Sequence, residues 1–221
     1  MTGLTVELEQ ARPAFIEQLR AFVAVAENLD DHQLLAASRC HGWAVLEVVV
    51  HVRGGLEEML RGFTAPTADP VTVDAASYWT AWAAADAVDP VDGILWTRRT
   101  ASAYRRPRSA LRHLRDAADA ALAAAHLLAD TPIRFQEHVL SAGDFLTIWA
   151  VELAVHQADL GRDLELPVPT TAALRLTRAT VEALLGAALP GTLTDLDVLL
   201  LGTGREAVPA ELGTIIHPVL G

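Results

Sequence analysis

Two residues near position 150 combine types and spacing that suit metal chemistry. From Phe145 to Val155 the chain is apolar except for Thr147 and Glu152, so a helix here has hardly any polar face to turn towards water. A carboxylate in that setting costs several kcal/mol unless it is paired or bound to a metal. Glu152 and His156 are four residues apart, which puts both side chains on one face of a helix. The pattern indicates two converging metal ligands, or else a glutamate paired with an arginine and a histidine bonded to a backbone carbonyl.

A third residue favours the metal interpretation. His51 follows three valines in EVVVH, and Gly54 and Gly55 come three and four residues later, so we expect the helix face beside the imidazole to stay empty. Metal sites in helical bundles bring ligands from facing helices together in the core. Two imidazoles and one carboxylate leave the fourth position of a zinc ion open, which is typical of a catalytic site. The sequence leaves Glu47, one turn before His51, open as a fourth ligand, a supporting partner or a solvated residue.

Helices must position these side chains. Ala, Leu and Arg dominate the periodic segments, whereas Gly and Pro stand mostly between them, so helix is the expected element. We expect an all-α protein, an up-down four-helix bundle in which residues 1–165 hold the metal and residues 166–221 form a helical or mixed segment packed on the bundle. The expected helices cover residues 5–28, 43–63, 74–86, 90–104, 107–128, 145–160 and 171–189, with a short turn at 32–37, partly extended chain at 133–140, and helix or strand at 195–201.

Composition and charge narrow the function classes. The chain has 221 residues, of which 52% are hydrophobic and 20% charged, enough for one domain with a sizeable core. The 17 basic residues are all arginines and face 28 acidic ones, and this net charge of −11 argues against a nucleic-acid partner. A single cysteine fits a reducing compartment. Because the chain has no signal-like start and no apolar run of roughly 18 to 20 residues, we expect a soluble, cytoplasmic monomer or homodimer without membrane contact.

Two segments carry a resemblance to a known family. CHGWAVLEVVVH (residues 40–51) and WAVELAVHQADL (residues 149–160) resemble the signature regions of the DinB-like metalloenzymes related to mycothiol-dependent maleylpyruvate isomerase. In that family a Gly-Trp turn opens a helix that carries the first histidine ligand, and a late helix supplies E-x-x-x-H with an aspartate three residues further on. The resemblance implies a DinB-like bundle over roughly residues 1–165, with His51, Glu152 and His156 as metal ligands and Asp159 as a supporting residue.

The resemblance also implies a cofactor and a co-substrate. The cofactor is a divalent metal, with zinc expected and nickel, copper and iron left open by the donor set. The co-substrate is mycothiol, a low-molecular-weight thiol, and metal coordination favours the thiolate form of a thiol. We therefore expect a mycothiol-dependent transferase or isomerase that acts on a small electrophile. A metal-dependent hydrolase and a non-catalytic protein that binds a small molecule or metal remain the alternatives.

The electrophile is expected to meet aromatic side chains. Maleylpyruvate isomerases use arginines to hold a dicarboxylate, whereas this chain has Tyr78, Trp79 and Trp82 between the two ligand helices. The sequence leaves the identity of the electrophile open. The residues expected to bind the substrate or the thiol are Trp82, Trp149 and Arg205, although Arg205 also suits a cap or a surface ion pair.

Two further features have a structural and a functional interpretation. Seven arginines fall between Arg98 and Arg115 without an acidic residue among them. They indicate a solvated helix face balanced by acidic neighbours, or else a rim for an anionic substrate or a partner contact. Cys40 stands in the CHGW turn, and no pattern around it indicates a lowered thiol pKa, so we expect a buried or inert thiol.

Overall fold

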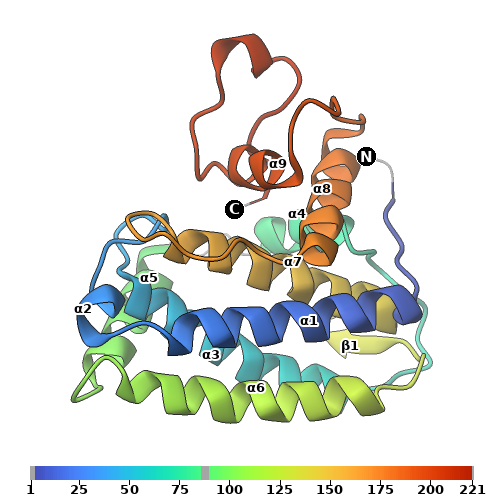
Figure 1. Ribbon diagram of the computed structural model, residues 1–221. Helices are drawn as coiled ribbons and strands as arrows, with labels where there is room; N and C mark the ends of the chain where they lie inside the picture. The colour runs from blue at the N-terminus through green and yellow to red at the C-terminus, as the bar shows by residue number, and fades with distance from the viewer. Residues whose placement is uncertain (1–2, 86–89, 221) are drawn as a thin grey trace.

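The chain folds into long helices joined by short connectors (Figure 1). The structure is a computed structural model that describes residues 3–85 and 90–220, without the side chains of residues 82–85 and 90. The helices are α1 (Leu8–Glu27), α2 (Asp31–Leu34), α3 (Val45–Phe63), α4 (Ser77–Ala85), α5 (Pro90–Ser102), α6 (Ser109–Leu127), α7 (Ala142–Leu160), α8 (Thr171–Leu185) and α9 (Asp195–Gly202), with a 3-10 turn at Ala210–Leu212 and two short strands, β1 (Ile133–Phe135) and β2 (His138–Leu140).

Four of these helices form the bundle. α1 packs against α6 and α7, and α3 packs against the same two helices from the other side (Figure 1). The centre of the bundle is filled by fully buried apolar side chains such as Phe15, Phe22, Leu114 and Phe145. The predicted mainly helical architecture, with a four-helix bundle, is confirmed.

α7 is the buried helix of the bundle. Of its 19 residues 18 are buried, and the exception is Glu152. The helix begins at Ala142, three residues before the predicted start, because Ser141 caps it: the Ser141 hydroxyl accepts a hydrogen bond from the Asp144 N–H. The apolar composition of this segment thus reflects contact on every side, and the glutamate marks the one place where the helix meets open space.

A small antiparallel hairpin lies between α6 and α7 in the chain. Its register pairs Ile133 with Leu140 and Phe135 with His138, so the turn consists of Gln136 and Glu137 alone. Both turn residues have left-handed backbone conformations, with φ of 46° and 63°. Two positive φ values suit the twist of a two-residue hairpin turn. The predicted extended chain at 133–140 therefore takes the form of two three-residue strands.

The C-terminal segment stands on the α7 side of the bundle (Figure 1). α8 packs against α7 and α1, and α9 packs against α8 and α7. α8 stops four residues before its predicted end, because Gly186 takes a left-handed conformation with φ of 73° and turns the chain. Residues 195–201, which the sequence left as helix or strand, are helical. A domain division at residue 165 stays a prediction. No helix in the described part of the chain has the length and apolar character to cross a membrane.

Candidate metal site and cavity

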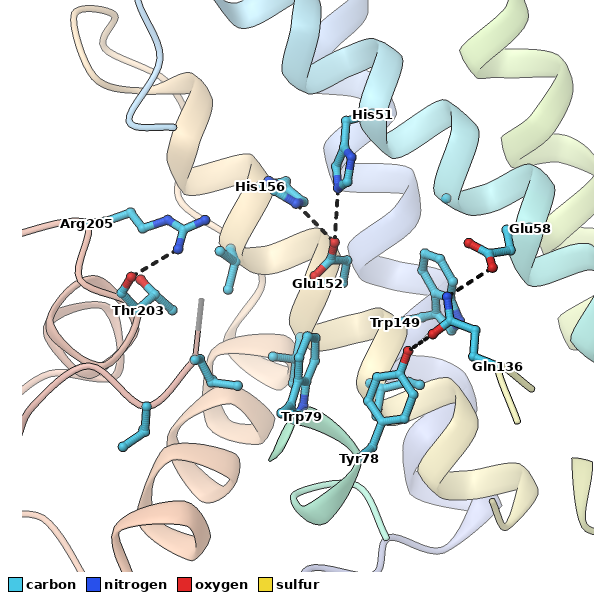
Figure 2. A pocket seen from close by; sticks show the side chains of 16 residues that line it. His51, Glu58, Tyr78, Trp79, Gln136, Trp149, Glu152, His156, Thr203 and Arg205 are labelled. Carbon is cyan, nitrogen blue, oxygen red and sulfur yellow. Dashed lines mark hydrogen bonds and ion pairs between the residues drawn. The ribbon is translucent and has the colours of Figure 1, made fainter. Parts of the chain in front are cut away.

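Three potential metal ligands meet where α3 faces α7. The Glu152 Oε1 atom lies 3.0 Å from His156 Nε2 and 3.4 Å from His51 Nε2 (Figure 2). One donor atom from each of the three residues lies within 4.8 Å of the others. His51 and Glu152 are 101 positions apart in the chain, and the bundle packing brings them together. Glu152 thus has two imidazole neighbours and no arginine partner among the described side chains.

The distances between these donors suit a single small cation. Zinc binds imidazole nitrogen and carboxylate oxygen at about 2.1 Å, so tetrahedral geometry separates neighbouring donor atoms by roughly 3.4 Å. The two distances to Glu152 Oε1, 3.0 and 3.4 Å, are close to that separation. The donor set of two imidazoles and one carboxylate is also one that zinc commonly takes in catalytic sites. The residues present therefore fit a divalent ion.

The pKa shifts of these groups also indicate that positive charge stabilises the carboxylate. Burial raises the pKa of Glu152, but the imidazoles of His156 and His51 outweigh that effect and hold the pKa below its usual value. Burial lowers the pKa of His156, but the charge of Glu152 and the bond to Asp159 raise it well above the usual value. The carboxylate is thus stabilised by positive charge beside it, supplied by a proton on the imidazole when no metal is bound. A metal ion and this proton compete for the same place.

Asp159 supports His156 from behind. His156 Nδ1–H donates to Asp159 Oδ2 at 2.9 Å, so Nε2 faces Glu152 and is the nitrogen that would give up its proton to bind a metal. The Cys40 thiol donates to the same Asp159 oxygen at 3.0 Å, and Arg205 Nε donates to the other oxygen at 3.1 Å. Burial raises the pKa of Asp159, but its bonds to His156 and Arg205 prevail and lower it to about 2. The aspartate is fully buried, charged and held from three directions.

Cys40, His156 and Asp159 form a second group with the ligand types of a metal site. Its geometry favours a supporting role. Asp159 already accepts hydrogen bonds from both partners, and Arg205 supplies the compensating positive charge. A cation in this group would displace those protons and lie next to a guanidinium, so we assign the group to the support of His156.

A cavity of about 300 Å³ opens beside Glu152. α3 contributes His51 and Glu58 to its wall, α7 contributes Trp149, Glu152 and His156, and α4 adds two aromatic side chains. The hairpin turn and the C-terminal segment complete the wall (Figure 2). The segment after residue 165 therefore forms part of the site. The wall also includes Gly55, Tyr78, Trp79, Gln136, Thr203 and Arg205.

The two glycines of α3 behave differently from each other. A Cβ atom at Gly55 would lie 3.1 Å from the six-membered ring of Trp149, whereas a Cβ at Gly54 would meet nothing within 4 Å. Glycines inside a helix indicate the close approach of another group, and Gly55 has one, because the Trp149 indole lies against it. The expectation that the face beside His51 stays empty is therefore wrong at Gly55. Trp149, expected near the substrate, lies on this glycine and lines the cavity.

The other candidate residues fall in several places. Arg205 lines the cavity while it is bonded to Asp159. The side chain of Trp82 lies outside the described residues, so its expected role stays a prediction. Glu47 accepts a hydrogen bond from the Ala44 N–H at 2.7 Å at the start of α3. This capping contact makes Glu47 part of the helix start and gives it no place in the ligand group.

The basic stretch from Arg98 to Arg115 lies away from the cavity. Arg106 forms an ion pair with Asp31, and Arg115 forms one with Glu27. No arginine of this stretch is among the described residues that line the cavity. These contacts favour the interpretation as a solvated face balanced by acidic neighbours.

Sequence reasoning missed four residues of this region. Cys40 was expected to be inert, yet its thiol bonds to Asp159. Glu58 lies seven residues after His51, a spacing that repeats on one helix face and could have indicated it. Tyr78 was noted only as an aromatic residue, although its hydroxyl is bonded within the cavity wall. No sequence signal indicates Gln136, because the hairpin turn alone decides where its side chain lies.

Comparison with known proteins gives a family and a fold. A family model described as the mycothiol maleylpyruvate isomerase N-terminal domain matches residues 15–161. The solved structure of mycothiol-dependent maleylpyruvate isomerase is similar with a TM-score of 0.58 and 13% identity, over 83% of this chain and 74% of that one. A histidine-to-alanine mutant of that isomerase gives a TM-score of 0.57 and 13% identity, over 80% and 70%. No curated protein matches.

The match to the family model covers more than half of the chain and includes both ligand helices. The solved structures support the same fold, and at 13% identity they support the fold alone. The predicted family is thereby confirmed. The chain belongs to the family of the mycothiol maleylpyruvate isomerase N-terminal domain.

Proposed function

We propose that this protein is a metal-dependent enzyme that uses mycothiol as a co-substrate, either to transfer the thiol to a small electrophile or to isomerise that electrophile. One observation carries the proposal. The donor atoms of His51, Glu152 and His156 lie within 4.8 Å of one another at the wall of a cavity large enough for a small molecule. Membership of a family named for a mycothiol-dependent isomerase supports the choice of thiol.

The accessibility of the three ligands suits an open site. The His51 and Glu152 side chains are 38% and 28% exposed, whereas His156 is only 7% exposed. A metal held by these residues is thus reached from the side of His51 and Glu152. A divalent ion there supplies a Lewis acid that favours the thiolate form of a thiol and leaves a position for a ligand.

The protein's own residues prepare the site before a ligand arrives. Asp159 accepts a hydrogen bond from His156 Nδ1–H and so holds the ring with Nε2 beside Glu152, where Nε2 would bind the metal after losing its proton. Arg205 holds Asp159 in place through two of its nitrogen atoms and bonds the Thr203 carbonyl with a third. The orientation of His156 therefore depends on a contact with the C-terminal segment.

The cavity wall suits a partly apolar electrophile. We propose that Trp149 packs against the electrophile and that Arg205 contacts the thiol or the electrophile at the end of the cavity near Asp159. Both side chains line the cavity, and Trp149 is only 8% exposed. Trp82 stays a third candidate for this role.

Metal content and thiol consumption test the proposal together. We expect the purified protein to bind one divalent ion per chain, measured by elemental analysis after dialysis. We expect metal-dependent loss of the mycothiol thiol when 1-chloro-2,4-dinitrobenzene is added, with the sulfur displacing chloride. His51→Ala and Glu152→Ala should each lose the stoichiometric metal and the thiol reaction while the helical circular dichroism signal is retained. The affinity loss should exceed the roughly 10- to 100-fold that follows loss of a supporting partner.

His41→Ala is the matched control, because His41 is exposed and does not line the cavity. It should keep both metal and activity. Metal retained in both ligand variants would overturn the site. Metal-dependent hydrolysis without a thiol would instead identify a hydrolase, and metal affinity without turnover a binding protein.

A further inference from the structure

A row of three hydrogen-bonded side chains forms one end of the cavity. We call Tyr78, Gln136 and Glu58 the distal wall. The Tyr78 hydroxyl donates to Gln136 Oε1 at 2.5 Å, and Gln136 Nε2 donates to Glu58 Oε1 at 3.0 Å (Figure 2). Burial, together with the charges of Glu152 and Glu58, raises the pKa of Tyr78, so its hydroxyl keeps its proton and remains the donor. Each side chain in the row therefore donates a hydrogen bond to the next, from Tyr78 through Gln136 to the Glu58 carboxylate.

The Glu58 carboxylate has acceptor capacity left over. Gln136 is its hydrogen-bond partner, and within the described part of the structure no cation pairs with it. Its neighbour Glu57, in contrast, forms an ion pair with Arg53 on the outer side of α3. A carboxylate accepts several hydrogen bonds. Among the described residues, the negative charge of the distal wall thus has a neutral amide as its only partner.

The hairpin turn holds Gln136 in this row. Gln136 and Glu137 have φ of 46° and 63°, in the left-handed region that few residues other than glycine, asparagine and aspartate adopt readily. A turn built only for its own stability would favour Asn-Gly or a similar pair. The glutamine at this position places an amide between the tyrosine and the glutamate.

Aromatic side chains surround the same space. Trp79 and Trp149 line the cavity together with Tyr78 (Figure 2). The face of an aromatic ring attracts a cation, and rings beside a carboxylate form a common recognition set for ammonium groups. The Nε1 atoms of both tryptophans are buried without a hydrogen-bond partner in the described residues. Because these two nitrogen atoms are buried, the rings present carbon surface to the cavity, which suits contact with a cation.

We propose that the distal wall binds the ammonium group of an amine-bearing electrophile. The proposal rests on the proposed function and narrows its substrate class. Glu58 accepts hydrogen bonds from the ammonium group, and the aromatic rings that line the cavity contact it. Glu58 follows His51 by two helical turns, which separates their positions on α3 by about 10 Å along the axis. The ligand therefore needs a spacer, such as one aromatic ring, between its amine and its reacting carbon. A carboxylate in place of the amine would meet repulsion at Glu58.

Three electrophiles of one skeleton test the charge preference. They are para-substituted benzylideneacetones that carry an aminomethyl, a hydroxymethyl or a carboxylate group, and calorimetric titration without thiol measures binding alone. For the full-length protein we expect the aminomethyl compound to bind at least about tenfold more tightly than the carboxylate, with the hydroxymethyl compound between them. Glu58→Gln, which keeps a side chain of the same size, should remove this preference.

Glu57→Gln is the matched control, because it changes the net charge equally on the exposed side of α3. It should keep the preference. Circular dichroism and the unfolding midpoint establish that both variants fold. Equal binding of the three compounds, or a preference that survives in Glu58→Gln, overturns the proposal even if thiol transfer is observed. If the expected order appears but the thiol reaction of the wild-type protein does not, the proposed function fails and the distal wall stands as an ammonium-binding site.

Discussion

The two ends of the cavity differ in how their charges are matched. In Figure 2 Arg205 and Glu58 lie on opposite sides of Glu152. Arg205 is bonded to the fully buried carboxylate of Asp159, so its positive charge already has a partner. Glu58 has a neutral amide as its only partner in the part of the chain that the structure describes. A ligand in the cavity therefore meets a negative charge without a counter-ion at Glu58 and a positive charge that is already balanced at Arg205.

The difference between Arg205 and Glu58 shows that the charges lining a cavity do not by themselves define its ligand. A count of ionisable groups would give the cavity an arginine for an anionic substrate. The hydrogen bonds show that the charge of this arginine is already balanced by Asp159, although its side chain lines the cavity. Glu58 should determine which ligand binds, because a ligand gains most from a charge that no counter-ion balances in the free protein.

The largest change in stability should follow from removing the carboxylate that balances Arg205. Asp159→Asn removes the negative charge that Arg205 and His156 share, and loss of one partner of a buried pair costs about 3 to 5 kcal/mol in the free energy of unfolding. Metal affinity should also fall, by roughly 10- to 100-fold. With Arg205 released, the carboxylate probe should bind more tightly than it does to the wild-type protein. Urea unfolding, metal competition and calorimetry measure the three effects.

Asp163→Asn is the control for this variant. Asp163 is exposed and lies 3.8 Å from Arg162, so its loss should change the free energy of unfolding by less than about 0.5 kcal/mol. If Asp159→Asn has the same free energy of unfolding as Asp163→Asn and binds the three probes in the same order, the proposed difference between the two ends of the cavity is wrong.

Asp144 sharpens the comparison, because it is a buried carboxylate with neutral donors only. Burial outweighs its bonds to the Val6 N–H and to Ser141 and raises its pKa to about 6. A folded-state pKa above the unfolded value of 3.8 gives a contribution to stability that is full below pH 3.8 and is lost as the pH rises through 6. Asp144→Asn should therefore gain stability relative to the wild type, by about 2 to 3 kcal/mol between pH 4 and pH 7.5. Urea unfolding at the two pH values measures it, and a difference independent of pH would refute the assignment.

The glycines between the two ends test the position of Trp149. Gly54→Ala adds a methyl group where nothing lies within 4 Å, so it should stabilise the protein by about 0.5 to 1 kcal/mol through helix propensity. Gly55→Ala adds one 3.1 Å from the Trp149 ring, so this gain should be cancelled by crowding. We expect the two variants to differ by about 1 to 2 kcal/mol in the free energy of unfolding, with weaker binding of the aminomethyl probe only in Gly55→Ala. Equal stability of the two would place the indole elsewhere.

The smallest effect should come from the basic stretch outside the cavity. Arg115→Gln breaks an ion pair with Glu27 in which the arginine side chain is 59% exposed. Such pairs contribute between about 0 and 1 kcal/mol. The free energy of unfolding should change within that range, and the order of the three probes should not change. A changed probe order would make this stretch part of the recognition surface.

The sequence by itself determined the helices and the spacing of the ligands. The apolar run around Glu152 predicts a buried helix, since a segment with almost no polar face must be covered on all sides. The four-residue spacing from Glu152 to His156 follows from helix geometry alone and does not depend on the rest of the fold. His51 was indicated by the valine run before it and the glycines after it, and the family resemblance added Asp159.

The positions of Cys40, Arg205 and Gln136 depend on the tertiary structure. The bond from Cys40 to Asp159 depends on how a connector lies against α7, and the bond from Arg205 depends on how the C-terminal segment docks. Gln136 reaches Glu58 only because a two-residue turn takes left-handed backbone angles between packed strands. Local spacing fixes neighbours within one helix, whereas contacts between elements depend on the packing of the whole core, which no short pattern encodes.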